Sequence, residues 1–158
     1  MRHSAILMVL AALLSAGPAA AQKIKNPIET VVILDGECDF RINGQKLECE
    51  GKLIYTKFAN HRVAFTGLPT ILAGVDFSGA KDVQPVPESY MLTVDRLILS
   101  GGTIVAADGF CSMETSTDAQ RVYKVECKAL GHDGRRFEFR FIPTAAPPSS
   151  NILIRRDL

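Results

Sequence analysis

Four acidic side chains fall within a short stretch of this sequence: Glu37, Asp39, Glu48 and Glu50. Side chains alternate along a strand, so a hairpin over this stretch would place all four on its outer face. Clustered carboxylates offer the hard oxygen ligands that Ca²⁺ prefers. The spacing matches no calcium-binding loop, however, and strand faces commonly carry solvated acids. We therefore predict no metal site and keep these four residues as the only candidates for one.

Four cysteines, Cys38, Cys49, Cys111 and Cys127, are the next residues with chemical potential. The sequence has no Cys-x-x-Cys motif, and no cysteine has a histidine beside it, which argues against a redox or zinc site. An even number of cysteines in an exported chain indicates disulfides. Spacing alone does not choose among the pairings, but hairpin geometry does.

Catalytic groups are not evident. His61 and His132 lie in predicted turns, without the positioned partner that a general base needs. Ser78 and Ser112 lack the Gly-x-Ser-x-Gly elbow of a nucleophilic serine. Gly101-Gly102 has neither the helix nor the lysine of a phosphate-binding loop. We predict no catalytic residue and no cofactor, with a hydrolase of unknown substrate as an alternative.

The first cysteine pair follows from a turn. Asn43-Gly44 is a strong signal for a two-residue hairpin, because both central residues must adopt positive φ. With these two at the tip, Cys38 faces Cys49 and Phe40 faces Leu47. The predicted disulfide is therefore Cys38–Cys49.

The same register sets like charges against each other. Asp39 would face Glu48, and Arg41 would face Lys46. Either diagonal contacts such as Arg41 with Glu48 compensate, or the register slips by two residues.

The later cysteines give a more consistent pattern. Pairing Cys111 with Cys127 sets apolar against apolar and acid against base. A three-residue turn ending at Gly134 then adds another strand with complementary neighbours. The predicted pairs are Met113 with Val125, Glu114 with Lys124, Ala129 with Phe137, Cys127 with Phe139, Lys128 with Glu138, and Glu126 with Arg140. The second predicted disulfide is Cys111–Cys127.

Short β-prone segments with turns between them fill the rest of the chain. We expect further strands at residues 29–34, 52–58, 63–66, 71–77, 89–99 and 103–107, and no helix of three turns. About 8–10 such strands predict an all-β antiparallel meander, closed into a small up-and-down β-barrel. A β-sandwich is the alternative.

The longest internal loop is expected at residues 81–88. Pro85, Val86, Pro87 and Tyr90 would form a partly apolar segment near the barrel rim. Long loops on rigid β scaffolds commonly carry recognition, so these four are the candidate binding loop. The alternative is a plain connection.

The N-terminus predicts an export signal. Arg2 precedes an uncharged apolar run at residues 5–14, Gly17-Pro18 breaks it, and small residues end at Ala21. The run is about half of the roughly 20 residues that cross a bilayer. Residues 1–21 are therefore a predicted signal peptide, cleaved near Ala21. No later stretch is long and apolar enough to span a membrane, so no transmembrane segment is expected in the mature chain.

The mature chain is predicted to comprise a single β-domain over residues 22–142. Residues 143–158 follow as a Pro-rich linker, with Asn151–Ile154 as a closing strand or a tail.

Charge and composition limit the partners. Removing Arg2 from 18 basic residues leaves 17, against 17 acidic ones. Phosphate binding needs concentrated basic residues, so nucleic acid is not an expected partner. We expect a bacterial envelope protein, periplasmic or secreted, that binds a small apolar ligand or a protein partner without catalysis. A structural or stress-protective periplasmic protein is the other non-enzymatic alternative.

Overall fold

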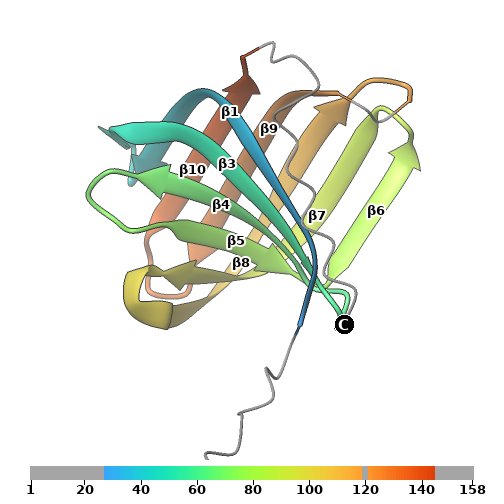
Figure 1. The fold of residues 1–158 in the computed structure, drawn as a ribbon. Helices are drawn as coiled ribbons and strands as arrows, with labels where there is room; N and C mark the ends of the chain where they lie inside the picture. The colour runs from blue at the N-terminus through green and yellow to red at the C-terminus, as the bar shows by residue number, and fades with distance from the viewer. Residues whose placement is uncertain (1–26, 119–120, 145–158) are drawn as a thin grey trace, which may run out of the picture.

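The computed structural model describes residues 27–118 and 121–144. The predicted signal peptide and the predicted closing strand or tail at residues 151–154 lie outside these ranges. The described residues form ten strands and one 3₁₀ turn, η1 (Ser100–Gly102), with turns between them (Figure 1). The strands are β1 (Ile28–Ile42), β2 (Gln45–Leu47), β3 (Cys49–Phe58), β4 (Val63–Pro69), β5 (Val75–Gly79), β6 (Lys81–Val86), β7 (Ser89–Leu99), β8 (Thr103–Thr115), β9 (Val122–Gly131) and β10 (Arg136–Pro143).

Eight of these strands close into an antiparallel barrel. Around the wall the order is β10, β9, β8, β7, β5, β4, β3 and β1, and β1 pairs with β10 to complete the circuit. The two remaining strands lie outside it, β2 paired with β1 and β6 paired with β7. Strands that follow each other in the chain are neighbours in the wall. The predicted all-β meander and barrel are confirmed.

β1 closes the barrel because it is long enough to pair with two strands, β3 and β10. Its first half, up to Asp35, pairs with β3, and its second half, from Gly36, pairs with β10. A Cβ on Gly36 would lie 2.3 Å from the Ile142 carbonyl oxygen, so only glycine fits where the partner changes. The sequence predicted separate strands here, whereas the extended backbone runs straight through this glycine.

The Asn43-Gly44 turn sets the register of the first hairpin as predicted. The two residues have φ of 53° and 79°. The observed pairs include Phe40 with Leu47 and Arg41 with Lys46. Asp39 relieves the contact between the two basic side chains: it accepts hydrogen bonds from Arg41 at 2.9 and 3.1 Å and lies 3.9 Å from Lys46. The register therefore does not slip.

The register of β8, β9 and β10 also follows the prediction. Cys111 faces Cys127, and the turn ending at Gly134 sets Cys127 opposite Phe139. Gly134 has φ of 86°, in the left-handed region that the turn requires. The other predicted pairs are all observed: Met113 with Val125, Glu114 with Lys124, Ala129 with Phe137, Lys128 with Glu138, and Glu126 with Arg140.

Phenylalanine rings fill the barrel. Six are at most 2% exposed: Phe40, Phe65, Phe77, Phe137, Phe139 and Phe141. The Phe139 ring centroid lies 5.8 Å from that of Phe40 and 6.3 Å from those of Phe77 and Phe141. Gly67 on β4 leaves room for this ring, since a Cβ there would lie 3.0 Å from it.

Two segments differ from the prediction. Residues 81–88 form β6 and a tight turn rather than a loop. Pro85 is tolerated in β6 because this strand lies at a sheet edge, where a missing N–H costs no ladder hydrogen bond. The predicted strand at residues 71–77 begins only at Val75, because the chain first turns at Leu72 and Gly74, whose φ is 137°.

An ion pair ties the β3–β4 turn to a bulge in β7. Arg62 donates two hydrogen bonds to the Asp95 carboxylate, at 2.7 and 3.0 Å, and lies 3.4 Å from the Ser78 hydroxyl. Asp95 sits where the β7–β8 register shifts, between Val94 and Arg96. The hydrogen bond from Arg62 lowers the pKa of Asp95.

Replacing Arg62 with alanine is expected to lower the free energy of unfolding by about 1 kcal/mol near neutral pH. The folded-state pKa of Asp95 is depressed, so its contribution is full above its unfolded value of about 4 and is lost as pH falls through the folded one. Urea denaturation should therefore show the difference shrinking near pH 3. The control, Lys52→Ala, removes one exposed ion pair with Asp35. If the difference in unfolding free energy between the wild type and Arg62→Ala persists in acid, Arg62 stabilises the protein through packing and not through its ion pair with Asp95.

Candidate functional site

The cysteines form the two predicted disulfides, Cys38–Cys49 and Cys111–Cys127. The second is fully buried in the barrel core, and the first is half-buried beside it. The Gly51 N–H donates to the Cys38 sulfur at 3.2 Å, just beyond the pair of Asp35 and Lys52 at which the pairing of β1 with β3 ends. All four cysteines of the chain are thus occupied in cross-links.

The four candidate carboxylates are not brought together as a ligand set. Asp39 is bonded to Arg41, which lowers the pKa of Asp39. Glu37 lies on β1, Glu50 lies on β3, and Glu48 stands between β2 and β3. Across residues 27–118 and 121–144, no group of three or more His, Cys, Asp or Glu side chains is placed to hold a metal ion. The geometry therefore gives no support to a metal site here.

His61 and His132 lie in turns, as predicted. His61 adopts a positive φ of 62° in the β3–β4 turn. His132 lies after β9, and its Nε2 is 3.0 Å from an Asp108 carboxylate oxygen, with both side chains exposed. Within the described residues, neither ring is hydrogen-bonded to a serine or cysteine, so the structure gives neither histidine a nucleophile to activate.

The structure separates the residues of the candidate binding loop. Pro85, Val86 and Pro87 are exposed at the end of β6 and in the turn after it. Tyr90 is 8% exposed, and its ring packs edge-on against Phe65. Burial raises the pKa of the Tyr90 hydroxyl, so it stays protonated. Tyr90 belongs to the core, and the exposed element is the β6–β7 hairpin.

The tip of this hairpin is anchored to the barrel. The Pro87 carbonyl accepts hydrogen bonds from the Gln84 side chain at 2.9 Å and from the Thr115 hydroxyl at 2.8 Å. The Thr115 N–H donates to the Glu88 carbonyl at 2.9 Å. β6 is therefore held as a strand against β7.

β6 is an edge strand. It continues β5 in one register against β7, with Ser78 facing Arg96 and Lys81 facing Thr93. β4 accompanies β5 only as far as Gly79, so no strand of the described residues covers the other side of β6. All six residues of β6 are exposed, and Figure 1 shows β6 at the border of the sheet. One side of its backbone thus presents unpaired N–H and C=O groups.

Four exposed apolar side chains cross the outer face obliquely from β6 to β9, and we call them the apolar strip. They are Val83, Met91, Phe110 and Leu130, which are 60, 41, 47 and 49% exposed. Val83 pairs directly with Met91. Met91 and Phe110 are diagonal neighbours on adjacent strands, and so are Phe110 and Leu130. Diagonal neighbours on one face are within reach of aromatic and long side chains. Exposed apolar side chains in such an arrangement are typical of an interaction surface.

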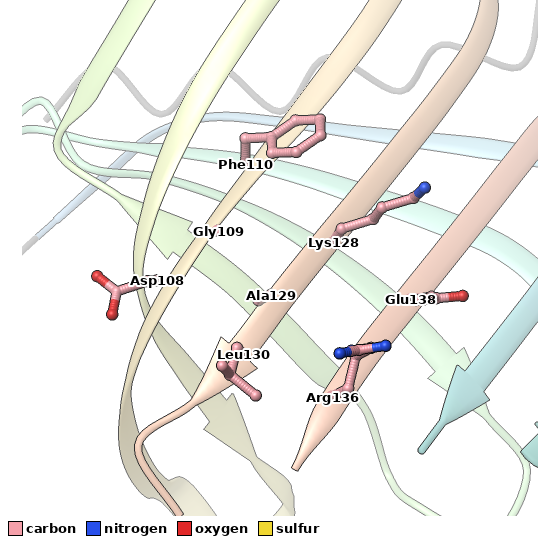
Figure 2. Close-up of a pocket in the computed structure, with 8 residues that line it drawn as sticks. All are labelled: Asp108, Gly109, Phe110, Lys128, Ala129, Leu130, Arg136 and Glu138. Carbon is pink, nitrogen blue, oxygen red and sulfur yellow. The ribbon is translucent and has the colours of Figure 1, made fainter. Parts of the chain in front are cut away.

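The apolar strip ends in a shallow groove on the outer side of β8, β9 and β10 (Figure 2). Its volume is about 360 Å³, and a second hollow of about 340 Å³ shares three of its residues. Figure 2 shows Phe110 and Leu130 at opposite ends, with Gly109 and Ala129 between them. The lining residues are Asp108, Gly109, Phe110, Lys128, Ala129, Leu130, Arg136 and Glu138.

Unpaired cations flank the strip. Lys81 and Lys128 lie on either side of Phe110 in one cross-strand row, with Thr93 between Lys81 and Phe110. Arg136 pairs with Leu130 in the β9–β10 ladder. In the part of the chain that the structure describes, none of these three cations has a carboxylate within ion-pair distance.

The nearby carboxylates differ in their partners. Glu126 contacts Lys124 at 3.4 Å, whereas Asp108 contacts only the His132 ring. Glu138 forms no ion pair within the described ranges, although it faces Lys128 in the ladder. Among the described residues, the three cations Lys81, Lys128 and Arg136 face two carboxylates without a Lys or Arg partner, which leaves this face with a surplus of one positive charge.

Sequence reasoning missed the apolar strip. Phe110 immediately precedes the buried Cys111, and Met91 immediately follows the buried Tyr90. Period-two alternation would have placed both side chains on the outer face. The available sequence signal for the apolar strip was therefore a large apolar residue at a position where the alternation of the strand places side chains outside the core.

Comparison with protein-family models, with curated proteins and with solved structures finds no match for this chain. Within residues 27–118 and 121–144 no helix has the length and apolar character needed to cross a lipid bilayer. A function can therefore be argued only from the geometry of this chain.

Proposed function

We propose that this protein is an exported binding module that takes up an extended segment of a partner protein along the open edge of β6. The supporting observation is that edge: one side of β6 has no neighbouring strand among the described residues, and every residue of β6 is exposed. An added strand satisfies such a backbone through main-chain hydrogen bonds, and alternate side chains supply specificity. The two disulfides are consistent with an oxidising, exported environment.

The contents of the barrel favour a protein partner over a small apolar ligand. An eight-stranded barrel either is filled by its own side chains or holds one small ligand. Here six phenylalanine rings and the buried disulfide occupy the interior. The two hollows described above lie on the outer side of β8, β9 and β10 or beside the β9–β10 turn.

β6 also carries features that limit indiscriminate pairing. Lys81 and Pro85 lie on the edge, and the register against β7 shifts between Val83 and Val86. Natural sheets use lysine, proline and bulges to block aggregation at their edges. The accessible edge is therefore short, which favours a specific partner segment over self-association.

A peptide selected from a random linear display library against the oxidised protein tests the proposal. Bound peptide should protect the β6 amides from hydrogen exchange, and N-methylating alternate peptide residues should abolish binding. Val83→Lys should weaken affinity about tenfold, since a lysine disfavours an apolar neighbour on the added strand. Ile104→Lys is the matched control, because Val83 and Ile104 are both 60% exposed.

Two results would contradict the proposal. The first is protection confined to strands other than β6. The second is an equal loss of affinity in Val83→Lys and Ile104→Lys, which would reflect added charge rather than the edge.

A further inference from the structure

The outer face beside β6 combines apolar and cationic side chains in a definite order. The apolar strip runs from Val83 on β6 to Leu130 on β9, and its four side chains are at least 41% exposed. Lys81 and Lys128 flank Phe110 in one row, and Arg136 stands beside Leu130. A partner that covers this face must bury apolar surface and neutralise cations at the same time.

The unpaired charges on this face determine which sign of charge the partner should carry. Among the described residues, Asp108 and Glu138 are the carboxylates of this face without a Lys or Arg partner, so they offset only two of its three cations. Covering a cation without a counter-charge costs free energy, whereas a carboxylate placed beside it recovers that cost. Complementary potentials also favour encounter with an acidic surface.

We infer that the partner contacts this face with an acidic segment that carries apolar side chains, lying along the apolar strip from β6 toward the groove of Figure 2. The inference rests on the proposed function, since it specifies the chemistry of the partner that pairs with β6. From β6 to β9 there are three interstrand spacings, about 14 Å, and the two diagonal steps add about 13 Å along the strands. The strip is therefore about 20 Å long, which about six extended residues span. Apolar residues of the segment cover the strip, and its carboxylates reach the lysines on either side.

Three synthetic peptides of about eight residues test this chemistry: Glu with Leu, Gln with Leu, and Lys with Leu. The two residue types follow each other in pairs, so that each face of the extended peptide carries both. Fluorescence anisotropy of labelled peptides on the full oxidised chain measures affinity. The Glu/Leu peptide should bind about tenfold more tightly than the Gln/Leu peptide, and the Lys/Leu peptide should bind most weakly. The difference in affinity between the Glu/Leu and Gln/Leu peptides should shrink when the salt concentration is raised from about 0.15 M to about 1 M, because salt screens exposed charges.

Charge reversal supplies the decisive variant. Lys128→Glu combined with Arg136→Glu should invert the order, so that the Lys/Leu peptide binds more tightly than the Glu/Leu peptide. The matched control is Lys52→Glu combined with Lys57→Glu, which makes the same change of net charge on β3. The control should keep the original order, and circular dichroism checks that both variants are folded.

Distinct outcomes overturn the inference and the proposed function separately. Equal binding of the Glu/Leu and Gln/Leu peptides, or equal effects of both charge-reversal variants, would overturn the inference. So would binding of dodecanoate at this face without binding of the Glu/Leu peptide, which would indicate an anionic amphiphile. If N-methylating the library-selected peptide leaves its binding unchanged, the pairing with β6 fails, while the contact of the Glu/Leu peptide with the face stands.

Discussion

Replacing Phe139 with alanine is expected to lower the free energy of unfolding by about 4 kcal/mol. The side chain is 2% exposed, and its ring lies against those of Phe40, Phe77 and Phe141. Removing it deletes one of the largest buried side chains and leaves a cavity between opposite walls, which strands pinned by hydrogen bonds cannot collapse to fill. Urea denaturation followed by circular dichroism measures the loss.

Phe110→Ala is the control for this substitution, because it makes the same change at a side chain that is 47% exposed. Its cost should be below about 1 kcal/mol, as is usual for surface substitutions. The control also removes the centre of the apolar strip, so it should weaken the Glu/Leu peptide while leaving the barrel intact. Similar losses of stability in Phe139→Ala and Phe110→Ala would show that the barrel interior is not tightly packed in solution.

Removing the buried disulfide by Cys111→Ala with Cys127→Ala is expected to cost about 3 kcal/mol. The two cysteines are 16 residues apart in the sequence, so the cross-link restricts the unfolded chain considerably. Both side chains are also fully buried, so their loss removes core packing. Denaturation of the oxidised variant and of the wild type measures the difference.

Cys38→Ala with Cys49→Ala is the matched comparison. Its cross-link spans 11 residues, so the chain-entropy contribution is only slightly smaller, but the two cysteines are half-buried. The early variant should therefore lose less stability than the late one. A larger loss in the early variant would mean that β1 beyond the end of its pairing with β3 depends on the disulfide Cys38–Cys49. This dependence would then exceed that of the core on the buried disulfide. Peptide mapping without reduction should give only the two observed pairs.

Local turn chemistry explains why so much of the fold could be predicted from the sequence. Asn43-Gly44 and Gly134 each fix which residues of the flanking strands face each other, and the disulfide Cys38–Cys49 follows from the first of these turns. The disulfide Cys111–Cys127 follows instead from the complementary side chains of β8 and β9. The long strand β1 could not be predicted in the same way. Its second half pairs with β10, far away in the sequence, and no local pattern specifies such a pairing.

The candidate site was less accessible to sequence reasoning. The segment at residues 81–88 stood out, but its two prolines indicated a loop, whereas an edge position accommodates Pro85 in a strand. The apolar strip joins residues from four strands, so it exists only once their relative positions are known. Sequence alternation places Phe110 on the outer face but does not say that Met91 and Leu130 lie diagonally beside it.

The double pairing of β1 has a consequence for the order in which the barrel forms. β1 is synthesised before the other described strands, and its early half can join β3 soon afterwards. Its later half has no wall partner until β10, the last strand described, becomes available. Closure is therefore a late event of high contact order, and such topologies fold slowly, on the order of milliseconds to seconds. Until then the phenylalanine-rich interior stays open to other chains, so any assistance that this protein receives while folding has to last until its final strand arrives.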